Sequence, residues 1–330
     1  MSVKKRNLLF ITAIVVILNL YIVLHHNILA DRTQEIIKKV ISCTILDAIY
    51  LVFVKAYDKI IVLPIELYQN RRLIWKLAKN DFKTRFAGSY LGIVWAFVQP
   101  IITVLMYWFV FEVAIPARAV AVKGDIDIPY ILWLIAGIVP WFFFSEALSS
   151  ATNALLEYNY LVKKVVFKIS ILPIIKIISA IFVHAFFVFF TLMLYSFYGY
   201  YPDLYTLQIF YYSFCMFVFI LGLSYMTCSI IIFFRDLGQI ISIALQVGIW
   251  ATPILWNLDT MAVNHPWLRY IFKLNPMNYI VEGYRNALID KIWFFETFYS
   301  TAYFWILTLC VFAFGALVFK RLKIHFADVL

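Results

Sequence analysis

The chain has 330 residues, of which 65% are hydrophobic and only 14% are charged. Soluble domains contain about 45–50% apolar and about 25% charged residues, so this composition excludes an ordinary soluble protein and predicts a polytopic membrane protein. A net charge of +10 would suggest a nucleic-acid partner for a soluble protein, but here the cations gather at the ends of apolar blocks. We therefore attribute them to membrane topology and anionic lipid, and expect no nucleic-acid partner.

Residues 1–66 form a hydrophobic extension with one or two expected helices. The apolar run 8–24 follows three cations, as in either a signal sequence or a first span. Ile28 fits poorly in a cleavage site ending at Ala30, which favours an uncleaved anchor with a cytoplasmic start. The second apolar stretch, 40–62, is expected to return across the membrane, with a helix lying on the surface as the alternative.

Segment 67–88 interleaves cations with apolar residues, which predicts an amphipathic helix in the cytoplasmic interface,. The simplest interpretation is a positive-inside anchor for the next span. Six cations beside a membrane portal also suit an anionic lipid headgroup such as a pyrophosphate. The candidate headgroup ligands are Arg71, Arg72, Lys76, Lys83 and Arg85.

The remaining chain, 89–330, predicts six core transmembrane helices in an all-α fold, because six apolar stretches approach the length of roughly 20 residues that crosses a bilayer. Pro253 should bend or end the fifth of them. Segment 257–300 has apolar patches too short to span, which predicts external re-entrant helices. The six stretches are 89–111, 130–156, 171–197, 206–234, 240–256 and 301–319.

Segment 157–170, called the elbow below, carries Lys163, Lys164 and Lys168 between two apolar blocks. These lysines are costly in hydrocarbon, so the elbow should lie at the cytoplasmic membrane surface as a short helical element. Two interpretations remain open here: an ordinary connecting loop, or a coupling element that docks on a cytoplasmic partner. Arg235 and Asp236 form a second, very short cytoplasmic corner.

Polar residues inside the apolar stretches are few. A stripe at helical spacing predicts either hydrogen bonds between helices or the lining of a polar path, and both remain open. It consists of Glu146, Ser149, Ser150, Asn153 and Glu157. His184 has no acidic partner one turn away, which favours a hydrogen-bonded packing residue over a proton relay.

Five segments in order resemble the permease subunits of type-2 ABC exporters for polysaccharides such as O-antigen, capsule or teichoic acid. The resemblance covers about residues 73–323. The sequence has Lys168-Ile169 where family members usually carry a proline-arginine pair, and most members lack the first 65 or so residues. The five segments are N-D-F-K-T-R-F-A-G-S-Y-L-G-I-V-W (80–95), L-V-K-K-V-V-F-K-I-S-I-L-P-I (161–174), F-F-R-D-L (233–237), A-T-P-I-L-W (251–256) and L-N-P-M-N-Y-I-V-E-G-Y-R (274–285).

The resemblance implies a homodimer in the bacterial inner membrane, enclosing a channel for a lipid-linked glycan and bound to two copies of a separate ATP-binding subunit. The sequence has no G-x-x-x-x-G-K-[ST] loop, so ATP and Mg²⁺ are expected on that partner and no cofactor on this chain,. The implied coupling residues are Tyr160, Leu161, Val162, Lys163, Lys164, Val165 and Phe167, with Arg235 and Asp236 as a minor second contact.

Aromatic residues make up 19% of the chain, more than two interfacial belts need,. Sugars stack their C–H faces on aromatic rings, so we predict that aromatics line the glycan path, with Trp95, Tyr107 and Trp108 as candidates.

Two other functions stay open. One is an exporter of a small amphiphile or drug. The other is a membrane-bound glycosyl- or acyltransferase, for which the sequence offers only Asp125-x-Asp127, in a loop predicted to lie outside, away from cytoplasmic nucleotide sugars,.

Overall fold

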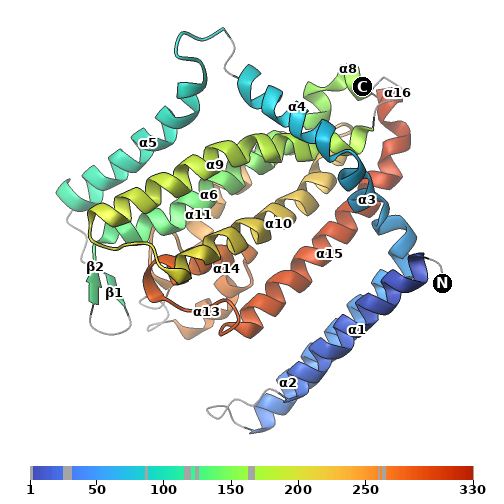
Figure 1. Cartoon of the computed structure of the whole chain (residues 1–330), viewed down its shortest axis with the longest axis horizontal. Coiled ribbons are helices and arrows are strands. Elements are labelled where there is room, and N and C mark those ends of the chain that lie inside the picture. Colours follow the sequence, from blue (N-terminus) through green and yellow to red (C-terminus); the bar gives the residue numbers. More distant parts are fainter. Residues whose placement is uncertain are drawn as a thin grey trace. The chain divides into compact units, whose positions relative to one another are not determined.

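The computed structural model describes residues 3–24, 32–85, 88–114, 120–122, 126–162, 168–258, 261 and 265–329. Helices dominate these residues (Figure 1), and the chain is an all-α polytopic membrane protein. It divides into two compact units, residues 1–64 and 65–330. Each unit is described by itself.

The first unit is a hairpin of two helices. Thr12 Oγ1 lies 2.7 Å from the Tyr50 hydroxyl, and the Asn19 amide donates to Asp47 at 2.8 Å. Asn19 and Asp47 are each closer in sequence to the connection between the two helices than Thr12 and Tyr50 are, so α2 runs antiparallel to α1. The bounds are Val3–Leu24 for α1 and Arg32–Ile60 for α2.

The second unit contains five helical stretches that are long and apolar enough to cross a membrane, counted over the described residues. They confirm five of the six predicted core spans. The remaining predicted span, the fifth in chain order, corresponds to α11, which has only 15 residues, about 22 Å of helix,. It ends at Ala251, just before Pro253, as predicted, because proline cannot continue the ladder of hydrogen bonds. The five stretches are 92–111, 130–152, 169–197, 204–230 and 298–325.

Four helices, α6, α9, α10 and α15, run alongside one another in this unit (Figure 1). The helix bounds are α3 (Val62–Gln69), α4 (Arg71–Thr84), α5 (Trp95–Trp108), α6 (Tyr130–Thr152), α7 (Ala154–Glu157), α8 (Asn159–Val162), α9 (Leu172–Phe197), α10 (Gln208–Ile230), α11 (Leu237–Ala251), α13 (Pro266–Lys273), α14 (Pro276–Arg285), α15 (Phe298–Leu322) and α16 (Phe326–Val329). Short 3₁₀ or π turns extend several of them, at 92–94, 109–114, 169–171, 204–207, 286–290 and 323–325.

Glycine and proline set the ends of the helices more sharply than hydropathy does. Gly88 and Gly92 have φ angles of 89° and 54°, which L side chains rarely adopt,. The resulting turn delays the first core span to Gly92, three residues after its predicted start. Pro266 and Pro276 open α13 and α14, which confirms the predicted pair of short helices,.

A small β-hairpin precedes α6. Strand β1 (Val120–Val122) pairs antiparallel with β2 (Ile126–Ile128), and Ala121 lies opposite Asp127. Asp125 falls outside the described residues. The helical patterns in the sequence gave no sign of these two strands.

Helix α6 forms the centre of the second unit, with 83% of its span buried against other elements. Helices α10 and α15 cross with their backbones close together, since a Cβ added to Gly315 would meet the Gly222 carbonyl oxygen at 2.3 Å. Small residues permit such backbone contact between membrane helices.

His184 is a hydrogen-bonded packing residue, as predicted. Its Nε2 lies 3.0 Å from the Tyr284 hydroxyl and 3.1 Å from Ser213 Oγ, and its ring stacks on Phe143. These contacts join α9, α10 and α14 inside the unit.

Candidate functional site

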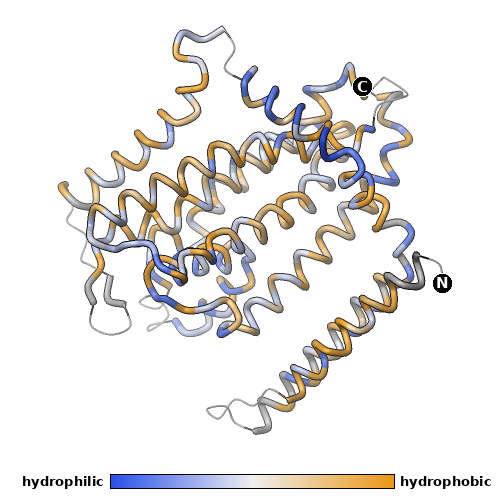
Figure 2. Tube along the Cα trace, in the orientation of Figure 1, coloured by the Kyte–Doolittle hydropathy of each residue, from blue (hydrophilic) through white to orange (hydrophobic). Residues whose placement is uncertain are grey.

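The site begins with the amphipathic helix α4. Apolar Ile74 and Ala78 are buried, and the ring of Phe82 contacts Phe182 of α9 at a centroid distance of 5.2 Å. The opposite face of α4 carries the cations, and Figure 2 shows the hydrophilic character of this helix beside the apolar bundle. The predicted amphipathic helix is therefore confirmed, and its apolar face packs on protein.

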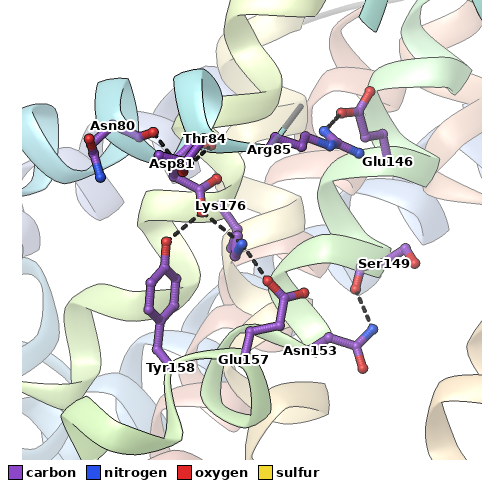
Figure 3. A network of polar contacts seen from close by, with 10 residues as sticks. All are labelled: Asn80, Asp81, Thr84, Arg85, Glu146, Ser149, Asn153, Glu157, Tyr158 and Lys176. Carbon is purple, nitrogen blue, oxygen red and sulfur yellow. Dashed lines mark hydrogen bonds and ion pairs between the residues drawn. The ribbon is translucent and has the colours of Figure 1, made fainter. Parts of the chain in front are cut away.

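Asp81 lies on the buried face of α4, where the sequence pattern alone would suggest an apolar residue. Its carboxylate accepts hydrogen bonds from the Tyr158 hydroxyl and from Lys176 Nζ, the latter at 2.7 Å. Lys176 Nζ also lies 2.5 Å from Glu157 and 4.9 Å from the centre of the Tyr158 ring. We call Asp81, Glu157, Tyr158 and Lys176 the charge cluster (Figure 3).

The charge cluster is largely shielded from solvent at its centre. The side chains of Lys176 and Asp81 are only 12% and 9% exposed. Removing one partner of such a buried pair typically costs about 3–5 kcal/mol, because the other charge stays buried without compensation. Burial raises the pKa of the Tyr158 hydroxyl, and its hydrogen bond to Asp81 raises it further, so this tyrosine remains a donor at neutral pH.

A second ion pair joins Arg85, at the end of α4, to Glu146 of α6. Between the two sets of charges lies a polar cleft of about 390 Å³, and Ser179 is among its buried lining residues. Two members of the predicted polar stripe, Glu146 and Glu157, thus bond to other segments. These two members of the stripe therefore join elements of the bundle, and a third member, Ser150, lines the cleft.

The elbow consists of short helices where the structure describes it. Helices α7 and α8 have four residues each and meet at Tyr158. Tyr160 is 56% exposed, Leu161 is partly exposed and Val162 is buried. The other predicted coupling residues of the elbow, Lys163, Lys164, Val165 and Phe167, lie outside the described residues.

The corner between α10 and α11 lies near the elbow. Gly238, at the start of α11, faces the Asn153 side chain at the end of α6. Arg235 and Asp236 in this corner are both exposed. The structure thus brings the second predicted coupling contact to the same end of the bundle as the first.

The predicted headgroup ligands are not equivalent. Four of them, Arg71, Arg72, Lys76 and Lys83, are exposed on α4. Arg85 instead pairs with Glu146. The first four leave α4 with a strongly basic face, while the charge of Arg85 is balanced within the protein.

The predicted path residues all lie on α5 but on different sides of it. Trp95 and Trp108 are 46% and 40% exposed, and Tyr107 is partly exposed and stacks on Phe111. At about 100° per residue, Trp95 and Trp108 point about 140° apart around the helix axis. One face of a single α5 therefore does not present both tryptophans.

Sequence reasoning missed Asp81 and Lys176 as site residues. The signal for Lys176 was a lone cation near the start of an apolar span, which is costly without a partner. For Asp81 it was the spacing of 74, 78 and 81, which places the carboxylate on the same helix face as the two buried apolar residues. Neither signal identifies the partner.

Comparison with known proteins places this arrangement in a family. A family model described as ABC-2 type transporter matches residues 72–289. Two relatives are each named O-antigen export system permease protein RfbA. The one from Myxococcus xanthus is 28% identical over 225 residues, 68% of this chain and 83% of the relative. One from Klebsiella pneumoniae is 27% identical over 264 residues, 78% of this chain and 95% of the relative.

The family match begins at α4 and runs through the elbow to the end of α14, so it contains the whole charge cluster and well over half of the chain. Four of the five spans, nearly all of the amphipathic helix α4 and the short-helix elbow lie in the matched region, whereas α15 follows it. The chain belongs to the ABC-2 type transporter family of membrane permeases.

Proposed function

We propose that this chain is the membrane-spanning subunit of an ATP-driven exporter that moves a lipid-linked polysaccharide across the bacterial inner membrane, from the cytoplasmic to the outer face. The observation that carries the proposal is membership of the ABC-2 family together with relatives, named as O-antigen export permeases, that align over as much as 95% of their length. The permease itself performs no hydrolysis in this scheme.

ATP and Mg²⁺ are held by a separate ATP-binding subunit, present in two copies. It contacts the elbow from Tyr160 to Phe167, with Arg235 and Asp236 as the second contact. The exposure of Tyr160 and of the α10–α11 corner, at one end of the bundle, supports this assignment.

Two copies of the chain enclose the glycan path. Helix α5 supports this arrangement, because only 6% of its span is buried within one chain. Aromatic residues of α5, namely Trp95, Tyr107 and Trp108, offer stacking surfaces from several sides of the helix, and two copies of α5 multiply those surfaces. The basic face of α4 attracts the anionic headgroup of the glycan lipid at the cytoplasmic surface.

The test is reconstitution of the full chain with the ATP-binding subunit encoded beside it, in proteoliposomes with and without a lipid-linked polysaccharide. We expect a stable complex whose ATP hydrolysis responds to the glycan lipid and whose Lys163→Glu/Lys164→Glu variant loses that response. Hydrolysis that responds to a small amphiphile and not to the glycan lipid would instead support a drug exporter. Failure of any ATP-binding subunit to associate would reject the proposal.

A further inference from the structure

Building on the proposed function, we infer that Lys176 is a positioning residue that makes the interfacial helix α4 and the elbow move together. Its ammonium group contacts carboxylates from two separate segments, Asp81 on α4 and Glu157 at the end of α7. The charge cluster thereby transmits displacement of the elbow to the helix that carries the headgroup cations.

The chemistry of Lys176 suits this role. An ammonium group has three donors, so one lysine can hold two carboxylates at 2.7 and 2.5 Å at the same time,. Tyr158 completes a closed set of contacts, since its hydroxyl donates to Asp81 while its ring faces Lys176. Movement of Glu157 or Tyr158 alone would leave the buried side chain of Lys176 or Asp81 with fewer partners.

The elbow depends on such contacts for its position. Helices α7 and α8 have four residues each, too few to hold a helical turn by themselves,. Lys176, by contrast, sits in the 26-residue helix α9. It provides a fixed point to which both the elbow and α4 are attached.

The apolar contacts of α4 would not serve the same purpose. Ile74, Ala78 and Phe82 hold α4 against the bundle, but apolar attraction is non-directional and tolerates sliding,. The bonds to Asp81 are directional, and the Arg85–Glu146 pair fixes the end of α4 to α6. Through these ionic contacts, motion received at the elbow would change the position of the basic face at which the headgroup is expected.

The first arm of the test is backbone hydrogen exchange in the full chain. If the charge cluster joins the two segments, Glu157→Gln should speed exchange across residues 75–83 of α4 as well as in the elbow. Asp81→Asn should likewise speed exchange across residues 158–162. Changes confined to the segment that carries the substitution would overturn the inference.

A matched control is Asp203→Asn, which removes an ion pair between Asp203 and Lys291 at 2.9 Å. That pair ties the loop after α9 to the residues that follow α14, and neither partner is a member of the charge cluster. Its loss should change exchange near residues 203 and 291 and leave α4 and the elbow unaltered.

The second arm measures glycan moved per ATP hydrolysed, at equal amounts of assembled complex. Lys176→Gln should lower this ratio by roughly fivefold or more, the lower end of typical coupling effects between sites. Lys176→Arg should restore much of it, because a guanidinium fork reaches two carboxylates. An unchanged ratio with merely less assembled complex would reduce Lys176 to a stability role and refute the inference.

The two arms separate this inference from the proposed function. If the unaltered chain binds no ATP-binding subunit and moves no glycan, the proposed function fails, while the exchange experiment still decides whether the charge cluster joins α4 to the elbow. If the unaltered chain exports glycan and the exchange effects stay local, the proposed function stands and the positioning role of Lys176 is refuted.

Discussion

At the residue scale, buried charges in this protein are held by specific partners. Arg285, at the end of α14, is 7% exposed, and its guanidinium donates to the carbonyl oxygens of Pro253 at 2.8 Å and Ile254 at 3.1 Å. It also lies 3.4 Å from the centre of the Trp133 ring. These contacts satisfy buried carbonyl groups in the turn that follows α11, so one side chain of α14 holds that turn in place,.

Arg285→Leu should lower the unfolding temperature of the purified chain in detergent. Each buried carbonyl left without a donor costs about 1–3 kcal/mol, and two lose theirs in this variant. Arg285→Lys keeps the charge but offers a single donor group, so it should fall between Leu and the unaltered chain. An Arg285→Leu variant as stable as the unaltered chain would contradict this account of the turn.

At the element scale, close packing of helices determines which of them form a fixed bundle. Helices α10 and α15 cross at Gly222 and Gly315 with their backbones in contact, whereas only 6% of the α5 span is buried. Membrane helices gain little from burial against one another, so backbone contact at small residues supplies much of their attraction. The bundle around α6, α10 and α15 is thus built differently from α5.

Gly315→Ala should destabilise the chain, because its Cβ would lie 2.3 Å from the Gly222 carbonyl oxygen and force α10 and α15 apart. Gly238→Ala is the matched control. Its Cβ would meet Ile231 at 3.4 Å, an ordinary contact, so this variant should keep the stability of the unaltered chain. Thermal unfolding in detergent measures both variants, and equal unfolding temperatures would disprove the tight crossing.

At the scale of the whole molecule, the sparsely packed α5 is the element that a second copy would cover in the proposed dimer. Its aromatic residues face several directions, which suits a path enclosed by more than one helix. Helix α4 and the elbow are joined through Lys176. In the proposed exporter, ATP-driven motion and headgroup capture would therefore occur side by side.

Trp95→Ala and Trp108→Ala, tested separately because they face different directions, should each lower glycan export while leaving assembly with the ATP-binding subunit intact. Loss of a stacking surface weakens the path without removing a packed core residue, since both side chains are 40% or more exposed,. Phe210→Ala, at an exposed aromatic position on α10, is the control and should not change export. Unchanged export in both tryptophan variants would reject these residues as part of the path.

The sequence by itself determined the class of protein and the order of its elements. Long apolar runs, the amphipathic pattern of α4 and the proline after α11 are local features, and hydropathy, helical period and loss of a backbone donor act over a few residues. The resemblance to polysaccharide exporters likewise rested on short segments in a fixed order, and the family match together with relatives named as O-antigen export permeases confirmed it.

Only the tertiary structure decided which charges meet. Asp81 and Lys176 are separated by 95 positions. Nothing in the sequence around either residue identifies the other as its partner among the ionic residues of the chain. Which charges meet depends on how α4, α6, α7 and α9 pack, and that packing is determined by many weak contacts added over the whole unit. The same reason explains why sequence counted Arg85 among the headgroup cations, whereas the fold pairs it with Glu146.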